Sequence, residues 1–192
     1  MSIEKAKSTD TVSSGLVAGT RAGEELVALG RFDYECIGAD GKVKWSGSSP
    51  NLVVNVGLAY MAGSSLTSVT PITAWYVGLY GAGASNTPAA ADTMSSHAGW
   101  TENVGYSNAT RVACTFVTAT TANPSVATNT ASPSSFTINA TSTVGGAFLT
   151  SGSAKSGTAG TLFSASDFTS PGDRSVTSGD TLNVTYTMSL AG

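Results

Sequence analysis

Residues 72 to 80 read Ile-Thr-Ala-Trp-Tyr-Val-Gly-Leu-Tyr and carry no charged side chain. β-Branched and aromatic residues dominate this stretch, and it lacks the polar residue at every second position that a half-exposed strand shows. The stretch is also short for a helix. Gly78 predicts a bend or the close approach of another backbone. We therefore expect a strand that is buried on both faces and needs a cover on each.

The composition indicates a folded chain with little surface charge. The chain has 192 residues, 41% of them hydrophobic and only 11% charged, with a net charge of −3. This length suits one domain, and a chain with so little charge is not expected to be disordered. Because the sequence has no basic cluster, we expect no binding to nucleic acid through phosphates.

The charges that exist are unevenly placed. No charged residue lies between Lys44 and Asp92, and none lies between Arg111 and Lys155. A large, weakly charged surface is a solubility risk for a free monomer and is better accommodated in an assembly. We therefore expect a homo-oligomer.

No targeting signal is recognisable. The N-terminal residues lack the apolar core of a secretory signal, and no apolar run approaches the length of a membrane span, so no membrane partner is expected. Cys36 and Cys114 are the two cysteines, and both are predicted to lie in strands as buried, reduced thiols.

The chain is divided near residue 30. Residues 1–29 are predicted to form an extended N-terminal arm, since they contain several glycines and show no clear apolar period. The arm is either a frayed terminus or a segment that orders on a neighbouring subunit, and we predict the second. Residues 30–192 are predicted to form one domain.

The best helix candidate follows Pro50. Ser49 would be its N-cap, Pro50 its first residue and Gly63 its stop signal. A broad apolar stripe supports a short buried helix rather than a strand, and it consists of Leu52, Val53, Val56, Tyr60 and Met61.

Alternating patterns predict several strands. Phe32, Tyr34 and Cys36 alternate with charged residues and lead into a hairpin turn at Asp40-Gly41. Further strands are expected around residues 112–116, 136–138 and 144–149. The clearest alternation places Leu182, Val184, Tyr186, Met188 and Leu190 on one face. These patterns predict a mainly β chain, an antiparallel β-sandwich of jelly-roll-like type with one short helix.

No catalytic motif accompanies this fold. His97 is the only histidine, and we expect it to be a hydrogen-bonded loop residue. Asp92 and Glu102 are the one nearby carboxylate pair that a glycosidase would need. The carboxylates of Asp167, Asp173 and Asp180 fit no calcium loop, and we expect them to be solvated. The chain is therefore not expected to be an enzyme, and no catalytic, cofactor-binding or metal-binding residue is assigned.

Several blocks of sequence resemble a group of small proteins found among tailed-bacteriophage structural genes. The blocks are Asn-Leu-Val-Val-Asn-Val-Gly (51–57), Trp-Tyr-Val-Gly-Leu (75–79), Ala-Asp-Thr-Met-Ser-Ser-His-Ala-Gly-Trp-Thr-Glu (91–102), 106–111 and 174–184. The resemblance extends from about residue 30 to the C-terminus. It implies a virion component, a capsid decoration or cement protein that assembles in the bacterial host cytoplasm and stabilises the shell by binding the major capsid protein. It also implies a trimer, since decoration proteins commonly occupy threefold positions.

Two other functions remain open at this point. A tail-fibre, adaptor or baseplate component would share the β-rich composition. A carbohydrate-binding module would use aromatic side chains as stacking platforms, and the candidates are Trp75, Tyr76, Trp100 and Tyr106.

Overall fold

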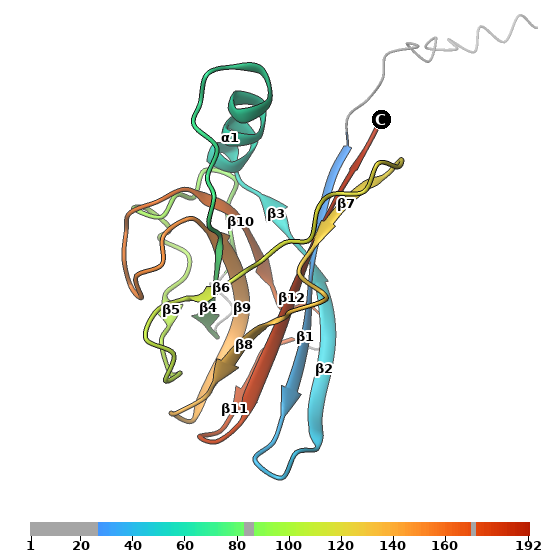
Figure 1. Cartoon of the computed structure of the whole chain (residues 1–192). Helices are drawn as coiled ribbons and strands as arrows, with labels where there is room; N and C mark the ends of the chain where they lie inside the picture. The colour runs from blue at the N-terminus through green and yellow to red at the C-terminus, as the bar shows by residue number, and fades with distance from the viewer. Residues whose placement is uncertain (1–26, 83–86, 170–171) are drawn as a thin grey trace, which may run out of the picture.

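The computed structural model describes residues 27–82, 87–169 and 172–192. These residues form one helix and twelve strands (Figure 1). In chain order they are β1 (Val27–Ile37), β2 (Val43–Pro50), β3 (Leu52–Val53), α1 (Asn55–Leu66), β4 (Tyr76–Gly81), β5 (Glu102–Asn103), β6 (Val112–Ala113), β7 (Ser125–Thr128), β8 (Ser134–Thr137), β9 (Ser142–Thr150), β10 (Leu162–Asp167), β11 (Arg174–Val176) and β12 (Thr181–Ala191). β1 begins three residues before the expected domain start, and residues 1–26 of the expected arm lie outside the described residues.

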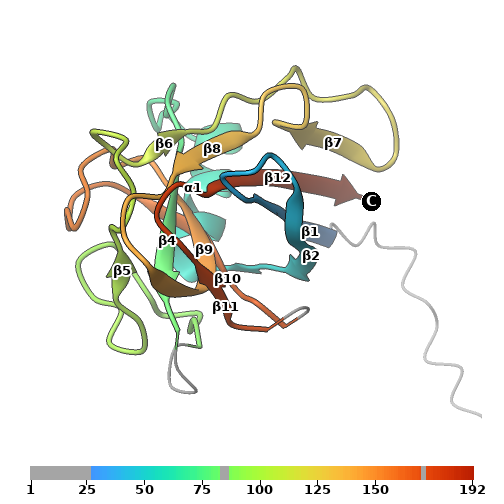
Figure 2. The same cartoon turned by 90° about the horizontal axis from the view of Figure 1, so that it is seen from below.

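The strands form two antiparallel sheets that pack face to face (Figure 2). The first has the order β2-β1-β12-β7, with β8 also paired to β12. The second has the order β3-β10-β9-β4-β5, with β11 on β9 and β6 on β4. β1 and β12 pair along their whole length, from Val27 opposite Ala191 to Ile37 opposite Thr181. The predicted mainly β, sandwich-type fold with one helix is thus confirmed.

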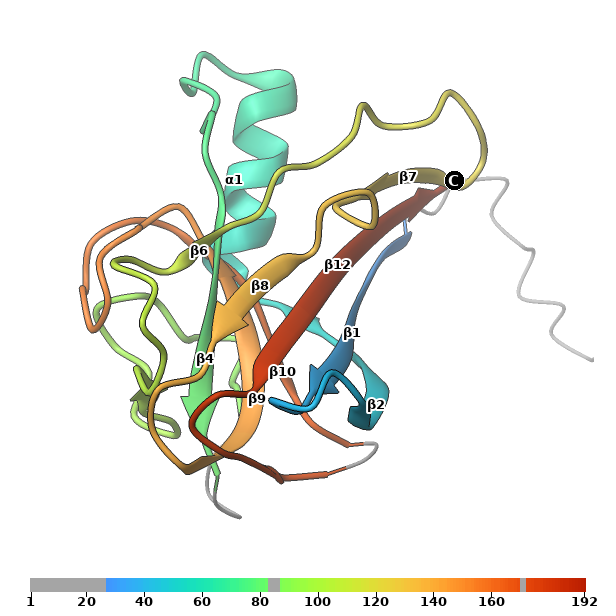
Figure 3. The same cartoon turned by 60° about the horizontal axis from the view of Figure 1, so that its bottom comes forward.

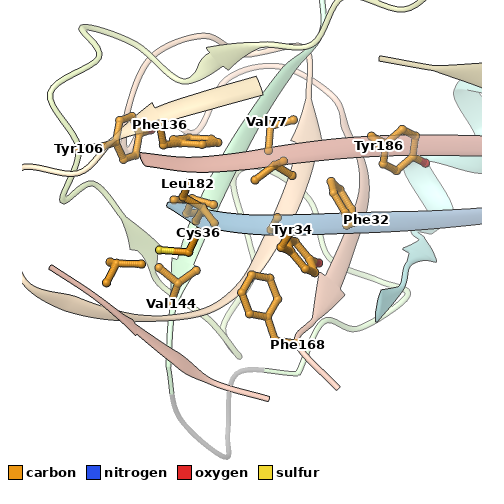
Figure 4. Packing of buried hydrophobic residues seen from close by; sticks show 14 of the residues in the cluster. Phe32, Tyr34, Cys36, Val77, Tyr106, Phe136, Val144, Phe168, Leu182 and Tyr186 are labelled. Atoms are coloured by element: carbon orange, nitrogen blue, oxygen red, sulfur yellow. The ribbon is translucent and has the colours of Figure 1, made fainter. Parts of the chain in front are cut away.

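The main core fills the space between the two sheets (Figure 4). Every second residue of β1 and β12 points into it, and the labelled side chains include Phe32, Tyr34, Leu182 and Tyr186. Residues between them, such as Asn183, lie on the outer face and are partly exposed. The alternation predicted for both strands is confirmed, because a two-residue period places one set of side chains on each face.

The outer face of the second sheet carries a smaller core. Tyr80 and Phe148 stand on this face, and Met94 and Trp100 from the connection after β4 cover them. This connection makes β4 a strand buried on both faces, as its sequence predicted. The described strand runs from Tyr76 to Gly81, so the first four residues of the predicted stretch lie outside it.

Gly78 allows this second core to form. A Cβ atom at Gly78 would overlap the ring of Phe148 on the neighbouring strand β9. The predicted close approach therefore occurs, although a side chain rather than a backbone makes it.

The helix does not begin where the sequence predicted. Pro50 ends β2, and Ser49 is buried, with its hydroxyl accepting a hydrogen bond from the Thr169 backbone N–H at 3.1 Å. β2 is an edge strand, a place where proline is tolerated because no ladder hydrogen bond is lost. The helix begins at Asn55 and continues through Gly63 to Leu66. The expected N-cap, first residue and stop signal were therefore all wrong.

Candidate interaction surface

One end of the sandwich is built from segments without charged residues. α1, β7, the first residues of β1 and the last residues of β12 all lie at this end (Figures 1 and 3). The first four residues of β1 (27–30) contain no Asp, Glu, Lys or Arg, and neither do α1, β7, β12 or the connection from α1 to β4. The hairpin between β1 and β2 lies at the opposite end and carries Asp40, Lys42 and Lys44. Within the described ranges, the protein therefore has one end with charged residues and an opposite end without them.

Large apolar side chains are exposed at the uncharged end. Leu66 at the end of α1 is 85% exposed, Leu58 on the same helix 46%, and Leu29 on β1 62%. Val69 and Val117 belong to the same group. We call these five residues the apolar end. A helix on a monomer surface usually presents charged or polar residues to water, so α1 is unusual in exposing leucine and alanine instead.

A small cavity opens between the two sheets beside α1. Its volume is about 150 Å³, and we call it the sandwich mouth. Its lining comes from the helix, from both sheets and from the connections between them, and consists of Tyr60, Trp75, Phe116, Ala127, Leu149, Phe163, Tyr186 and Met188. Trp75 makes edge contacts with Tyr60 and Phe163, with ring centroids 5.4 and 5.3 Å apart. The mouth is therefore an aromatic site next to the apolar end.

Two hydroxyl groups near the sandwich mouth are already engaged. The Tyr60 hydroxyl accepts a hydrogen bond from the Ile72 backbone N–H at 2.8 Å. The Tyr186 hydroxyl accepts one from Asn51 Nδ2 at 2.8 Å. The mouth thus offers ring faces and aliphatic groups to an occupant, and it favours an apolar one.

A buried ion pair forms the most polar cluster of the structure. Arg111 is 1% exposed, and its Nε and Nη2 donate to the two Glu102 carboxylate oxygens at 2.9 and 2.8 Å. The guanidinium also donates to the carbonyl oxygens of Gly152 and Gly157 and lies over the Phe148 ring. Glu102 accepts a further bond from the Ser156 N–H at 2.7 Å. The bonds to Gly152, Gly157 and Ser156 hold the loop after β9 onto the ion pair, so the cluster has a structural role.

Lys155 fastens the same loop a second time. Its Nζ donates to the Tyr106 carbonyl oxygen at 2.6 Å and lies 3.9 Å from the centre of the Tyr106 ring. Burial lowers the pKa of Lys155, and the nearby Glu102 carboxylate opposes this shift. The sequence patterns did not predict this cluster, although Glu102 was considered as a carboxylate candidate. The sequence does contain a signal for a structural role of Arg111, because this residue is an isolated charge before a long uncharged stretch.

The residues that were considered as catalytic candidates also form hydrogen bonds within the protein. Asp92 accepts hydrogen bonds from the Trp100 indole N–H and the Ala89 N–H, both at 2.9 Å. His97 Nδ1 lies 2.9 Å from the Trp100 carbonyl oxygen, which agrees with the expected hydrogen-bonded loop histidine. Trp100 itself is 3% exposed, so it cannot be the stacking platform of a carbohydrate-binding module.

Asp180 corrects the expectation of a solvated carboxylate. It is buried, and its Oδ2 accepts hydrogen bonds from Lys44 Nζ at 2.7 Å and from the Thr177 N–H at 2.8 Å. Burial alone would raise the pKa of Asp180, but these hydrogen bonds outweigh burial and lower it. Cys36 lies beside it, and burial raises the pKa of that thiol to about 11. Both cysteines are free and buried, as predicted. Cys36 lies in β1, but Cys114 follows the end of β6 instead of lying in a strand.

Within the described ranges, no group of three or more His, Cys, Asp or Glu side chains is placed to hold a metal ion. Nor is any helix in those ranges long and apolar enough to cross a membrane. The class that the fold defines is a two-layer antiparallel β protein with a projecting helix. Comparison of the chain with family models, curated proteins and solved structures gave no match.

Proposed function

We propose that this chain is a structural protein of a tailed-phage virion, a capsid decoration or cement protein that binds the major capsid protein and stabilises the shell. The observation that carries the proposal is the apolar end. Exposed leucine and valine side chains on uncharged elements are costly for a free monomer and are typical of a surface that another protein covers.

The polarity of the molecule supports the same function. A protein that decorates a shell needs one face for the lattice and another that stays in solvent. The apolar end would meet the shell, where burial of apolar area provides the binding energy. The charged hairpin between β1 and β2 would then face solvent. The sequence resemblance to phage structural proteins gives the partner its identity in this proposal.

A binding experiment with matched variants tests the proposal. Leu66→Glu places a charge at the apolar end, and Val43→Glu places the same charge on an exposed valine near the charged hairpin. Shells of the phage that encodes the chain, depleted of this protein, would be incubated with each variant and sedimented. We expect Leu66→Glu to lose binding by about tenfold or more, because a buried unpaired charge costs several kcal/mol. Val43→Glu should bind like the parent protein.

Equal binding by the two variants would contradict the role of the apolar end. No binding of the parent protein to shells would contradict the decoration function itself. Copy number in purified virions gives an independent answer, because a decoration protein should approach the abundance of the major capsid protein. A tail component would be present in far fewer copies.

A further inference from the structure

We propose that residues 11–20 of this chain, through Leu16 and Val17, fill the sandwich mouth. These residues lie outside the described part of the chain, and the inference uses their sequence and position in the chain. It does not depend on the proposed function, because it concerns contacts between parts of this protein.

The sandwich mouth needs a small apolar occupant. Its volume of about 150 Å³ matches that of a cavity that binds benzene, so one aliphatic side chain would fill it. Its two tyrosine hydroxyls are engaged elsewhere, and no charged residue belongs to its lining. A charged side chain would lose its hydration there without gaining a partner.

Residues 11–20 fit these requirements better than the rest of the N-terminal segment. They read Thr-Val-Ser-Ser-Gly-Leu-Val-Ala-Gly-Thr and form the uncharged stretch between Asp10 and Arg21. Leu16 and Val17 are adjacent large aliphatic residues, and small residues flank them on both sides. Small neighbours let a backbone approach an aromatic surface closely. Ile3 and Leu26, by contrast, each stand next to a glutamate.

The length of the chain allows this contact. Val27 begins β1, and Met188 of the mouth lies opposite Gly30 on the same pair of strands. Three strand residues span about 10 Å, so the N-terminal segment enters the sandwich about that far from the mouth. The ten residues from Val17 to Val27 reach up to about 35 Å when extended. The segment can therefore reach the mouth of its own sandwich or that of a neighbouring copy.

Disulfide trapping in the full-length protein tests the contact directly. Leu16→Cys combined with Ala127→Cys places one thiol on the segment and one in the mouth lining. The matched control is Ser8→Cys with Ala127→Cys, in which the first thiol lies before the uncharged stretch. The native Cys36 and Cys114 are buried and should not compete. We expect the Leu16 pair to form a disulfide about tenfold faster than the control pair, because docking raises the local thiol concentration.

The form of the product identifies the source of the segment. A cross-linked monomer means that the segment fills its own mouth, and a covalent dimer means that it fills a neighbour's. Either product supports the proposal. A Val17→Cys pair is made in parallel, so that the orientation of one side chain does not decide the result.

A second measurement follows Trp75, which lines the mouth and is partly exposed. Trp45 is replaced by phenylalanine, so that the fluorescence accessible to a quencher comes mainly from Trp75, because Trp100 is buried. Acrylamide quenching of this fluorescence should increase when Leu16 and Val17 are both changed to serine. The proposal would be overturned if the Leu16 and Val17 pairs form disulfides no faster than the Ser8 control pair. Unchanged quenching of Trp75 fluorescence in the serine variant would also contradict it.

Discussion

Among single residues, Arg111 joins several segments of the chain through its guanidinium group. It joins Glu102, Gly152 and Gly157, and removing its side chain would leave the Glu102 carboxylate buried without a counter-ion. Breaking a buried pair in this way typically costs about 3–5 kcal/mol. We expect that loss of unfolding free energy for Arg111→Leu, measured by urea denaturation.

The matched control is Arg31→Leu, which removes an ion pair with Asp33 on the exposed face of β1. Exposed pairs contribute about 0–1 kcal/mol, so this variant should stay close to the parent. Equal losses in the two variants would show that the Arg111 cluster does not hold the loop as described.

Asp180 makes the folding stability of the protein depend on pH in the acidic range. Its folded pKa is lowered, so its contribution is complete above the unfolded pKa of about 3.9 and is lost as the pH falls through the folded value. We expect Asp180→Asn to be less stable than the parent at neutral pH and to lose less stability below about pH 4. Thermal melts between neutral and acidic pH measure both effects. The control Asp40→Asn removes a carboxylate from the neighbouring exposed turn and leaves the hydrogen bonds of Asp180 in place. A stability curve for Asp180→Asn that matches the parent at every pH would refute the assignment.

At the scale of secondary-structure elements, β4 holds the two cores together. Val77 and Leu79 point into the core between the sheets, while Tyr80 points into the core under Trp100. The sequence predicted a strand buried on both faces, and Val77 and Leu79 are nearly fully buried. Trp75 is only partly buried, and it is this residue that contacts the helix, through Tyr60.

Leu79→Ala tests this placement of β4. The side chain is 1% exposed, and its removal should cost about 2–5 kcal/mol, depending on how far the core relaxes. The measurement is the unfolding free energy in urea. The exposed Leu58 on α1 provides the control, since Leu58→Ala should cost far less. A Leu79→Ala variant that melts within a degree or two of the parent would show that the strand is misplaced.

The sequence predicted β1 and β12 from their two-residue period, in which polar residues on one face alternate with apolar residues on the other. It predicted β4 and β9 from their mainly apolar runs. β10 was missed because Ser164 and Ser166 interrupt its pattern. Both serines are buried, and they donate hydrogen bonds to the Tyr186 hydroxyl and the Pro50 carbonyl oxygen. A polar residue with a buried partner looks the same in sequence as a solvated one.

The helix start was misplaced for a related reason. Ser49 and Pro50 have the composition of a helix N-terminus, but their neighbours in the fold come from residues more than a hundred positions away. Local sequence cannot supply such contacts. The observed helix has no side-chain cap, so it leaves no N-terminal signal to read.

At the scale of the whole molecule, the separation of charge from apolar surface is the feature that carries the functional argument. The sequence shows the long uncharged stretches, but it does not show that they meet at one end. Antiparallel pairing of β1 with β12 places the first described residues beside the C-terminus, and α1 adds Leu58 and Leu66. The apolar end therefore arises from the topology of the chain.

The resemblance to phage decoration proteins leads us to propose that the protein is a homotrimer, and the exposed apolar end supports self-association in general. Sedimentation of the recombinant protein measures its mass in solution, and we expect the mass of three chains. Leu66→Glu should shift the equilibrium toward smaller species if the apolar end also joins the subunits. A monomer in solution, combined with isolated single-copy density on particles, would refute the trimer.

We propose that this chain coats a phage shell and that its apolar end contacts the shell. A reconstruction of the virion at a resolution that distinguishes the two ends of the sandwich tests it most directly. We expect density for this protein on the capsid lattice, with α1 toward the major capsid protein and the hairpin between β1 and β2 toward solvent. Density confined to the tail, or a lattice contact made by that hairpin, would contradict it.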